Sequence, residues 1–232
     1  MASDSPPEQR DDGAGAEERY ASRDQLRALA HPLRLEIMTR IGRRGTARAA
    51  DIAEDLGLPA NSVSYHLRTL ARGGVIQEAP EAARDRRDRV WKLAQHSFEH
   101  GRRSGVDPAA VDEDYLAASG ATSLAGLDWF RAAWIANLAD HRDHHSADDP
   151  RRGLGSLQAM DLRLSPEQAE EFVGRVTDLI QEMHRLNRDE SGADVPGDPD
   201  SDDEARDFRL LFGLTATHPE AVPRSDPSRD GS

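Results

Sequence analysis

The sequence predicts a mainly helical α+β fold, with a helix-turn-helix and a β-hairpin near the N-terminus and a helix-strand-helix-strand region after them. Three observations support this prediction. Two amphipathic segments, within 47–59 and 61–72, meet at a short turn that contains a glycine. Strand-like runs follow at 75–79 and 89–94. Helical and strand-like patterns then alternate over 122–217.

Length and composition describe a chain that can fold but is heavily solvated. It has 232 residues, 37 % of them apolar, and a mean hydropathy of −0.74, so we expect one folded unit with disordered ends. The lack of Cys excludes disulfides, thiolate metal sites and cysteine nucleophiles. No apolar run approaches 18 residues and no secretory leader is visible, so we expect a cytoplasmic protein without membrane contact.

The formal net charge of −13 is distributed unevenly along the chain. Residues 1–21 carry two basic and six acidic side chains, residues 22–103 carry 16 and 10, and residues 104–232 carry 12 and 27. A basic segment therefore lies between two acidic ones. Because salt screens charges over about 10 Å, phosphate attraction is local, and the basic segment is compatible with nucleic-acid binding.

Two helices are predicted at the start of the basic segment. The run LRALA at 26–30 is apolar-periodic and ends at His31, because the residue before a proline is pushed away from helical geometry. Pro32 suits the first turn of the next helix, whose apolar residues recur at helical spacing up to Ile41. The two helices are therefore expected to meet at a kink.

Residues 47–59 predict a third helix and a tight turn, because apolar residues fall on one face until Gly57 ends the pattern. Only Gly57, Leu58 and Pro59 separate this pattern from Ala60 and the segment NSVSYHLRTLAR at 61–72. Wound as a helix, this segment has a narrow apolar stripe and a polar opposite side. The stripe consists of Val63, Leu67 and Leu70. Helix, glycine turn and helix make a helix-turn-helix.

A hairpin is predicted after the second of these helices. The pair Gly73-Gly74 ends the helix, VIQEA at 75–79 is typical of a strand, and RVWKLA at 89–94 is typical of its returning partner. The charged run EAARDRRD between them, at 81–88, is expected to be a loop. A hairpin in this position is a wing.

These segments together resemble the winged helix-turn-helix of the ArsR-type bacterial transcription regulators. The resemblance covers about 24–95, through the run LRALAHPLRLEIM…ADIAEDLGLPANSVSYHLRTLARGGVIQE…RVWKLA. Its central pattern, S-x-H-L-x-x-L-x-x-G-x-[VI], is present as Ser64, His66, Leu67, Leu70, Gly73 (or Gly74) and Ile76. The chain departs from the metal-sensing members, which carry a Cys pair, and is similar to the cysteine-free ones.

The resemblance implies that the helix at 60–72 is the recognition helix and that 80–89 forms the wing. An isolated helix of this kind would be an ordinary surface helix, but the hairpin and the basic surroundings favour a face that enters the major groove of DNA. His66 lies near the apolar stripe and is equally compatible with a boundary position, and Ser64 is also borderline. The candidate DNA-binding residues are Asn61, Ser62, Ser64, Tyr65, His66, Arg68, Thr69 and Arg72 of the helix, and Arg84, Arg86, Arg87 and Arg89 of the wing.

The C-terminal half predicts a helix, a strand, a helix and a last strand. The helix at 123–145 carries a broad apolar stripe, from which we predict the dimer interface: Leu127, Phe130, Trp134 and Leu138, with Trp129 on the same helix. Strands are expected at 156–165 and 208–216, on either side of a helix that begins after a hydroxyl cap at Ser165. This region either completes a dimer or holds a small ligand.

The domain organisation that follows has six parts. They are a disordered acidic arm at 1–21, the winged helix-turn-helix at 22–98, a linker at 99–121, a dimerisation or effector domain at 122–217, an acidic disordered loop within it at 189–206, and a disordered tail at 218–232.

The run DHRDHH at 140–145 offers a metal-binding alternative. His141 with His145, and Asp140 with His144, have i, i+4 spacing on a helix, although a frayed polar helix end explains the same residues. His96 and His100 form a weaker pair of the same kind. We therefore predict no metal site, and keep a metal-responsive regulator as the alternative.

No glycine-rich phosphate loop, nucleophile elbow or other enzyme pattern occurs, so we expect neither enzymatic activity nor a cofactor. The sequence favours a DNA-binding transcription regulator, a repressor that binds a palindromic operator in double-stranded DNA as a homodimer. A small-molecule effector is left open, and so is a winged helix that docks a protein instead of DNA.

Overall fold

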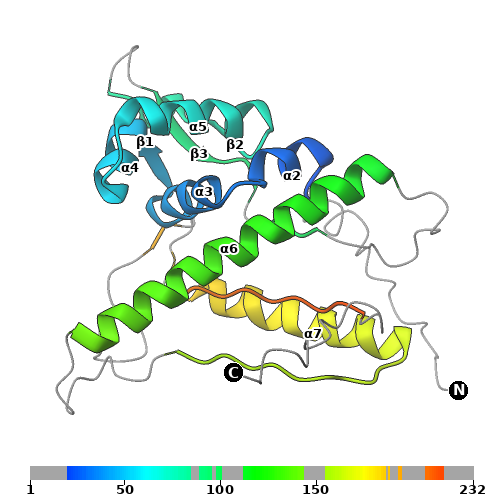
Figure 1. Cartoon of the computed structure of the whole chain (residues 1–232). Coiled ribbons are helices and arrows are strands. Elements are labelled where there is room, and N and C mark those ends of the chain that lie inside the picture. Colours follow the sequence, from blue (N-terminus) through cyan, green and yellow to red (C-terminus); the bar gives the residue numbers. More distant parts are fainter. Residues whose placement is uncertain are drawn as a thin grey trace, which may run out of the picture.

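The structure, a computed structural model, describes most of the chain. The described residues are 20–84, 89–95, 98–100, 112–143, 155–186, 188, 193–194 and 207–216. Their helices are α2 (Arg23–Leu29), α3 (Pro32–Arg44), α4 (Ala49–Leu56), α5 (Ala60–Arg72), α6 (Glu113–Asp143) and α7 (Pro166–Arg185), and their strands are β1 (Thr46–Arg48), β2 (Ile76–Glu78) and β3 (Val90–Leu93). The mainly helical α+β class is confirmed (Figure 1).

The kink between the first two helices forms where the sequence predicts it. Ser22 and Gln25 form a capping box that starts α2, and Pro32 occupies the first turn of α3. The side chain of His31 caps α3, because its Nδ1 accepts a hydrogen bond of 3.1 Å from the Leu33 N–H. The imidazole at the kink is therefore a structural cap in its neutral form.

The helix-turn-helix consists of α4 and α5, joined by three residues. Gly57 adopts a left-handed conformation, with φ of +61°, and the Leu58 N–H closes the turn by donating to the Ala53 carbonyl at 2.9 Å. In α5 the predicted stripe of Val63, Leu67 and Leu70 is completely buried. The opposite face of α5 is consequently turned outward.

A three-stranded antiparallel sheet supports the two helices, in the order β1-β3-β2. The hairpin of β2 and β3 is confirmed, with Gln77 opposite Lys92. The sequence does not predict the edge strand β1, because the helical pattern of 47–59 includes its residues from 47 onward. Ala47 instead pairs with Trp91 of β3 and is buried, so a long-range ladder overrides the helical pattern of this short segment.

The hydrophobic core lies among α2, α3, α4, α5 and the sheet. Its largest fully buried side chains are Leu26, Leu29, Ile37, Ile41, Ile52, Val63, Leu67, Leu70 and Val75. Trp91 and Ala125 also belong to this core, and Trp129 packs against it from α6. The N-terminal unit therefore includes part of a helix that the sequence assigns to the C-terminal half.

Helix α6 is longer than the sequence predicts and packs against α2 and α3 (Figure 1). It begins at Glu113, so the second part of the predicted linker, 113–121, is helical. The side that meets α2 carries small residues, among them Ala118 and Thr122, and the buried Thr122 hydroxyl donates to the Leu26 carbonyl at 2.7 Å. Small residues such as Ala, Ser and Thr give no clear apolar periodicity. The sequence therefore does not predict the first turns of this helix.

The C-terminal unit differs from its prediction in the strands. Helix α7 starts at a capping box formed by Ser165 and Gln168, as expected, but none of its residues is buried. The segments 156–165 and 208–216, predicted as strands, are not paired into a sheet among the described residues. Their alternating pattern is present, but neither segment pairs with a strand in the part of the chain that the structure describes. In the part of the chain that is described, no helix is long and apolar enough to cross a membrane.

Candidate nucleic-acid interface

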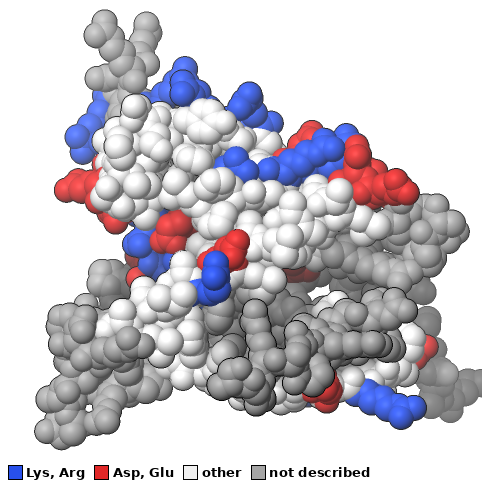
Figure 2. All heavy atoms as spheres, viewed as in Figure 1, with Lys and Arg blue, Asp and Glu red and all other residues white. Residues whose placement is uncertain are grey.

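The outward face of α5 is polar and carries two arginines. Asn61, Arg68 and Arg72 are exposed, and Tyr65 is 57 % exposed although it is aromatic. Figure 2 shows basic side chains along the edge of the molecule where α5 lies in the view of Figure 1. An exposed helix face of this composition can donate and accept hydrogen bonds at base edges and phosphates.

A groove runs between α5 and the returning wing strand β3. It is lined by Tyr65, Arg68, Ala71 and Arg72 of α5 and by Arg89 and Trp91 of the strand side. Trp91 is almost completely buried and contributes an apolar part of the lining of this groove. Arg68 and Arg89 also border a second hollow, next to Ser64 and Ala49. Cationic groups from helix and wing thus converge on one surface.

The wing contains internal ion pairs that reduce its positive charge. Arg89 lies 3.7 Å from Glu78, with both side chains exposed, and Lys92 lies 2.6 Å from Glu81. The hydrogen bond from Lys92 is the main reason that the pKa of Glu81 is lowered. Exposed pairs of this kind exchange readily for a phosphate, because each contributes little stability. Arg84 is described at the end of the 80–84 segment, whereas Arg86 and Arg87 lie outside the described residues.

The hydroxyl groups of α5 are partly used within the helix. Ser64 donates to the Ala60 carbonyl at 2.8 Å, and Thr69 donates to the Tyr65 carbonyl at 3.2 Å. At the first turn, the Asn61 side chain accepts from the main-chain N–H of Ser62 at 2.9 Å. Each hydroxyl oxygen can still accept a bond, but the arginines and Tyr65 are the side chains with the greater reach.

His66 faces the body of the protein. Its ring centroid lies 5.2 Å from that of His31, at the kink between α2 and α3, and its Nδ1 is buried without a hydrogen-bond partner among the described residues. Burial, followed by the charges of His31 and Arg34, lowers the pKa of His66, and burial with Arg34 lowers the pKa of His31. Both rings are neutral at pH 7, and this geometry favours the boundary interpretation of His66.

The apolar stripe predicted on α6 is partly exposed and partly half-buried. Leu127 and Leu138 are 55 % and 47 % exposed, whereas Phe130 and Trp134 are half-buried and stack on each other at 6.0 Å between centroids. Trp129 turns the other way and packs against the core of the N-terminal unit. The helix is therefore anchored by one tryptophan and leaves its leucines outside.

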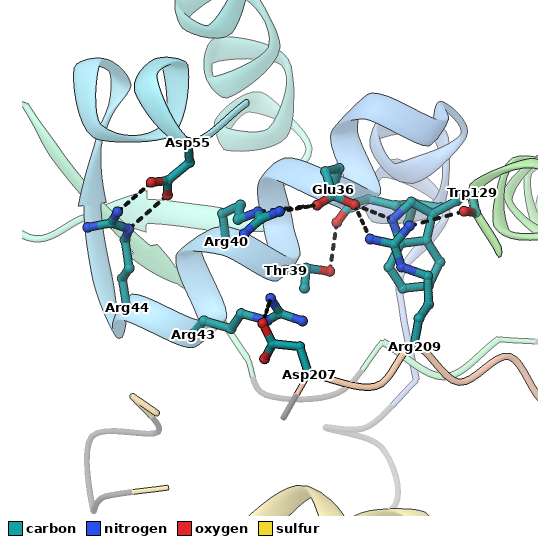
Figure 3. Close-up of polar contacts among 10 residues, drawn as sticks. Glu36, Thr39, Arg40, Arg43, Arg44, Asp55, Trp129, Asp207 and Arg209 are labelled. Carbon is teal, nitrogen blue, oxygen red and sulfur yellow. Dashed lines mark hydrogen bonds and ion pairs between the residues drawn. The ribbon is translucent and has the colours of Figure 1, made fainter. Parts of the chain in front are cut away.

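A polar cluster that the sequence does not reveal joins α3, α6 and the segment 207–216 (Figure 3). Glu36 accepts hydrogen bonds from Arg40 at 3.2 Å, from Trp129 Nε1 at 2.9 Å, and from Arg209. Burial alone would raise the pKa of Glu36, but the Trp129 hydrogen bond and the charges of Arg209 and Arg40 outweigh it and lower the pKa.

Most histidines of the alternative metal site lie outside the described residues. Across the described ranges, no group of three or more His, Asp or Glu side chains is placed to hold a metal ion. His144 and His145, the side chain of His141, and His96 lie outside the described residues. His100 is described, lies 3.0 Å from the Ser119 hydroxyl, and has a pKa lowered by burial.

Part of the chain matches a known protein family. Residues 29–78 match a family model described as a helix-turn-helix domain, and this range runs from the end of α2 to the end of β2. No curated protein matches the chain. The matched range includes α4, the Gly57 turn and the complete helix α5. The chain therefore carries a helix-turn-helix DNA-binding domain.

Proposed function

We propose that the protein is a bacterial transcription regulator of the ArsR type, a cytoplasmic repressor that binds a palindromic operator as a homodimer. The observation that carries this proposal is the exposed face of α5, where Arg68 and Arg72 stand beside a groove that Arg89 closes from the wing side. The match to a helix-turn-helix domain and the basic character of 22–103 support it.

In the proposed complex the α5 face reads the major groove. Arg68 and Asn61 supply paired donors and acceptors for guanine and adenine edges, and Tyr65 packs its ring against a base or sugar. Ser62, Ser64, Thr69 and Arg72 hold neighbouring phosphates and fix the register of the helix. His66, turned toward His31, supports α5 from behind instead of touching DNA.

The wing supplies a grip that does not depend on sequence. Arg84, Arg86, Arg87 and Arg89 lie within six consecutive positions of the sequence, and each guanidinium that neutralises a phosphate releases condensed counterions. The result is affinity that falls steeply with salt. Because one recognition helix covers only a half-site, two copies related by a twofold axis are needed for an operator of ordinary length.

The function proposed here needs no catalytic group, no metal and no cofactor. Its output is occupancy of the operator, and repression follows when that occupancy blocks polymerase. The C-terminal unit, with α7 and the segments beside it, is assigned to dimerisation, and a small effector bound there would act by changing the spacing of the two recognition helices.

Footprinting on the DNA upstream of the protein's own gene tests this function. We expect a protected pair of half-sites, and fluorescence anisotropy with that duplex should show at least about tenfold weaker binding for Arg68→Ala, the loss of one bidentate base contact. Arg175→Ala, on the exposed surface of α7, is the matched control and should bind like the unaltered protein. Equal binding by the Arg68→Ala and unaltered proteins, or no retention of any duplex at low salt, would refute the proposal.

A further inference from the structure

The segment 207–216 uses one of its two faces to attach itself to its own chain. Arg209 stacks its guanidinium 4.0 Å above the Trp129 ring, donates to the Trp129 carbonyl at 3.1 Å, and pairs with Glu36. Leu211 points in the same direction, since its Cδ1 lies within 3.5 Å of the place where a Cβ on Gly126 would stand. Asp207 adds an ion pair of 2.6 Å with Arg43.

The other face of this segment is apolar and largely uncovered. Phe208 and Leu210 are 64 % and 61 % exposed, Leu214 is exposed as well, and Phe212 contacts Phe172 of α7 with 6.0 Å between ring centroids. Side chains that alternate in this way between an attached face and a free face are the pattern of a β-strand. Figure 1 shows the segment as an extended run beside α7.

The main chain of this strand-like segment is also unsatisfied. Among the described residues, no main-chain hydrogen bond joins 208–216 to another segment. A strand that is rigidly held on one face and open at its edge is a template for the addition of a second strand.

The neighbouring helix α7 has no buried residue. Twelve of the eighteen large apolar side chains that are exposed in the described residues lie between Leu157 and Leu214. The missing partner must therefore cover strand and helix together.

A second copy of the same segment fits this edge. In an antiparallel pair centred on Leu211, Phe208 stands opposite Leu214, and Leu210 stands opposite Phe212, so that apolar residues face apolar residues on both sides of a twofold axis. In the same register Arg209 stands opposite Gly213. A Cβ built on Gly213 would have no atom within 4 Å, so there is room for the Arg209 side chain to keep its contacts with Glu36 and Trp129. A two-stranded ribbon is marginal by itself, and the two α7 helices would supply the layer that buries it.

We propose that residues 208–214 form the twofold centre of the homodimer, by antiparallel pairing of this strand with its copy, and that the apolar face of α7 closes over the pair. The proposal rests on the homodimer of the proposed function and refines it: the interface lies at the C-terminal strand and not at the apolar stripe of α6 that the sequence predicts. Because Arg209 ties this strand to Glu36 and Trp129, the dimer centre is coupled to α3 and hence to the helix-turn-helix. The contacts of Arg209 with Glu36 and Trp129 would then set the distance between the two recognition helices.

Sedimentation of the full chain without DNA tests whether the dimer interface lies at the C-terminal strand or at α6. We expect a dimer, and we expect Leu210→Glu to raise its dissociation constant at least about tenfold, because two carboxylates enter an apolar contact. Leu127→Glu, at a comparably exposed leucine of α6, is the matched control and should leave the dimer intact. Since Leu210 is exposed in the single chain, circular dichroism should show that both variants remain folded.

The absence of Cys allows the register to be tested directly. In Leu211→Cys the two new thiols stand opposite each other, within the range that a disulfide spans, so mild oxidation should give a covalent dimer on a non-reducing gel. In Phe208→Cys the two thiols are separated by about 20 Å along the ribbon, six residues of strand rise, and dilute protein should stay uncrosslinked.

The outcomes distinguish this inference from the function on which it rests. A dimer that survives Leu210→Glu, or that forms no Leu211→Cys cross-link, overturns the strand pairing and leaves DNA binding untouched. A full chain that stays monomeric and protects a single half-site overturns the homodimer itself. A strand-paired dimer that retains no duplex at low salt refutes the regulator and upholds the interface.

Discussion

The indole of Trp129 donates a hydrogen bond of 2.9 Å to Glu36, which joins α6 to α3 across 93 positions of the sequence. The carboxylate is half-buried, and Arg40 and Arg209 supply the positive charge that allows it to stay ionised there. This contact attaches α6 to the helix that precedes the helix-turn-helix.

Removing the charge of Glu36 should destabilise the fold. In Glu36→Gln the amide cannot accept from three donors as well as a carboxylate can, and we expect a loss of about 1–3 kcal/mol in the free energy of unfolding at pH 7. Urea denaturation measures this loss, and Glu170→Gln on the exposed side of α7 is the control.

The effect of Glu36→Gln should also depend on pH. Because the pKa of Glu36 is lowered in the folded state, the stability that its charge contributes is complete above the unfolded pKa of about 4.3 and is lost as the pH falls through the folded pKa. The difference between variant and unaltered protein should therefore shrink near pH 3.

The pair of His31 and His66 should make stability depend on pH in a different window. Both pKa values are lowered in the folded state, so the unfolded chain binds more protons as the pH falls below the unfolded value of about 6.5. The urea midpoint should consequently decrease between pH 7 and pH 5. In His66→Gln, which removes one titrating ring, the decrease should be smaller. A midpoint that is flat over this range in the unaltered protein would contradict the buried, neutral pair.

Gly73 allows α5 to approach α2, and a side chain there should be costly. A Cβ at this position would lie 2.4 Å from the Ala28 Cβ and 2.9 Å from the Asp24 carbonyl oxygen. We expect Gly73→Ala to destabilise by about 1–3 kcal/mol, the usual cost of overpacking. Gly120→Ala is the matched control, because it lies in α6 with open space around its Cβ position and should stabilise by roughly 0.5–1 kcal/mol. Thermal unfolding of both variants checks the contrast.

The wing arginines should act on affinity without acting on sequence preference. Replacing Arg89 by Gln should weaken binding to operator and unrelated duplexes by the same factor, and lower the slope of log affinity against log salt by about 0.9 for one lost phosphate contact. Arg175→Gln should leave the slope unchanged. A preferential loss on the operator would assign Arg89 to base contact instead.

Local signals made the helix-turn-helix predictable. The spacing of Val63, Leu67 and Leu70 and the glycine at position 57 act over a few residues, so their effect on the backbone is visible in the sequence. The segment 208–216 shows the limit of this reasoning. Its alternation predicts a strand, but a strand exists only where a second one pairs with it, and this chain supplies none among its described residues.

The amino-acid sequence by itself determined which helices form in the DNA-binding unit and which side of α5 faces outward, because burial periodicity and capping are properties of neighbouring residues. Tertiary structure alone decided that Ala47 joins a sheet, that α6 begins at Glu113, and that His66 turns toward His31. It also decided that Arg209 meets Glu36, 173 positions away. Such contacts depend on packing between segments, whose energy exceeds local propensity and leaves no periodic trace in either one.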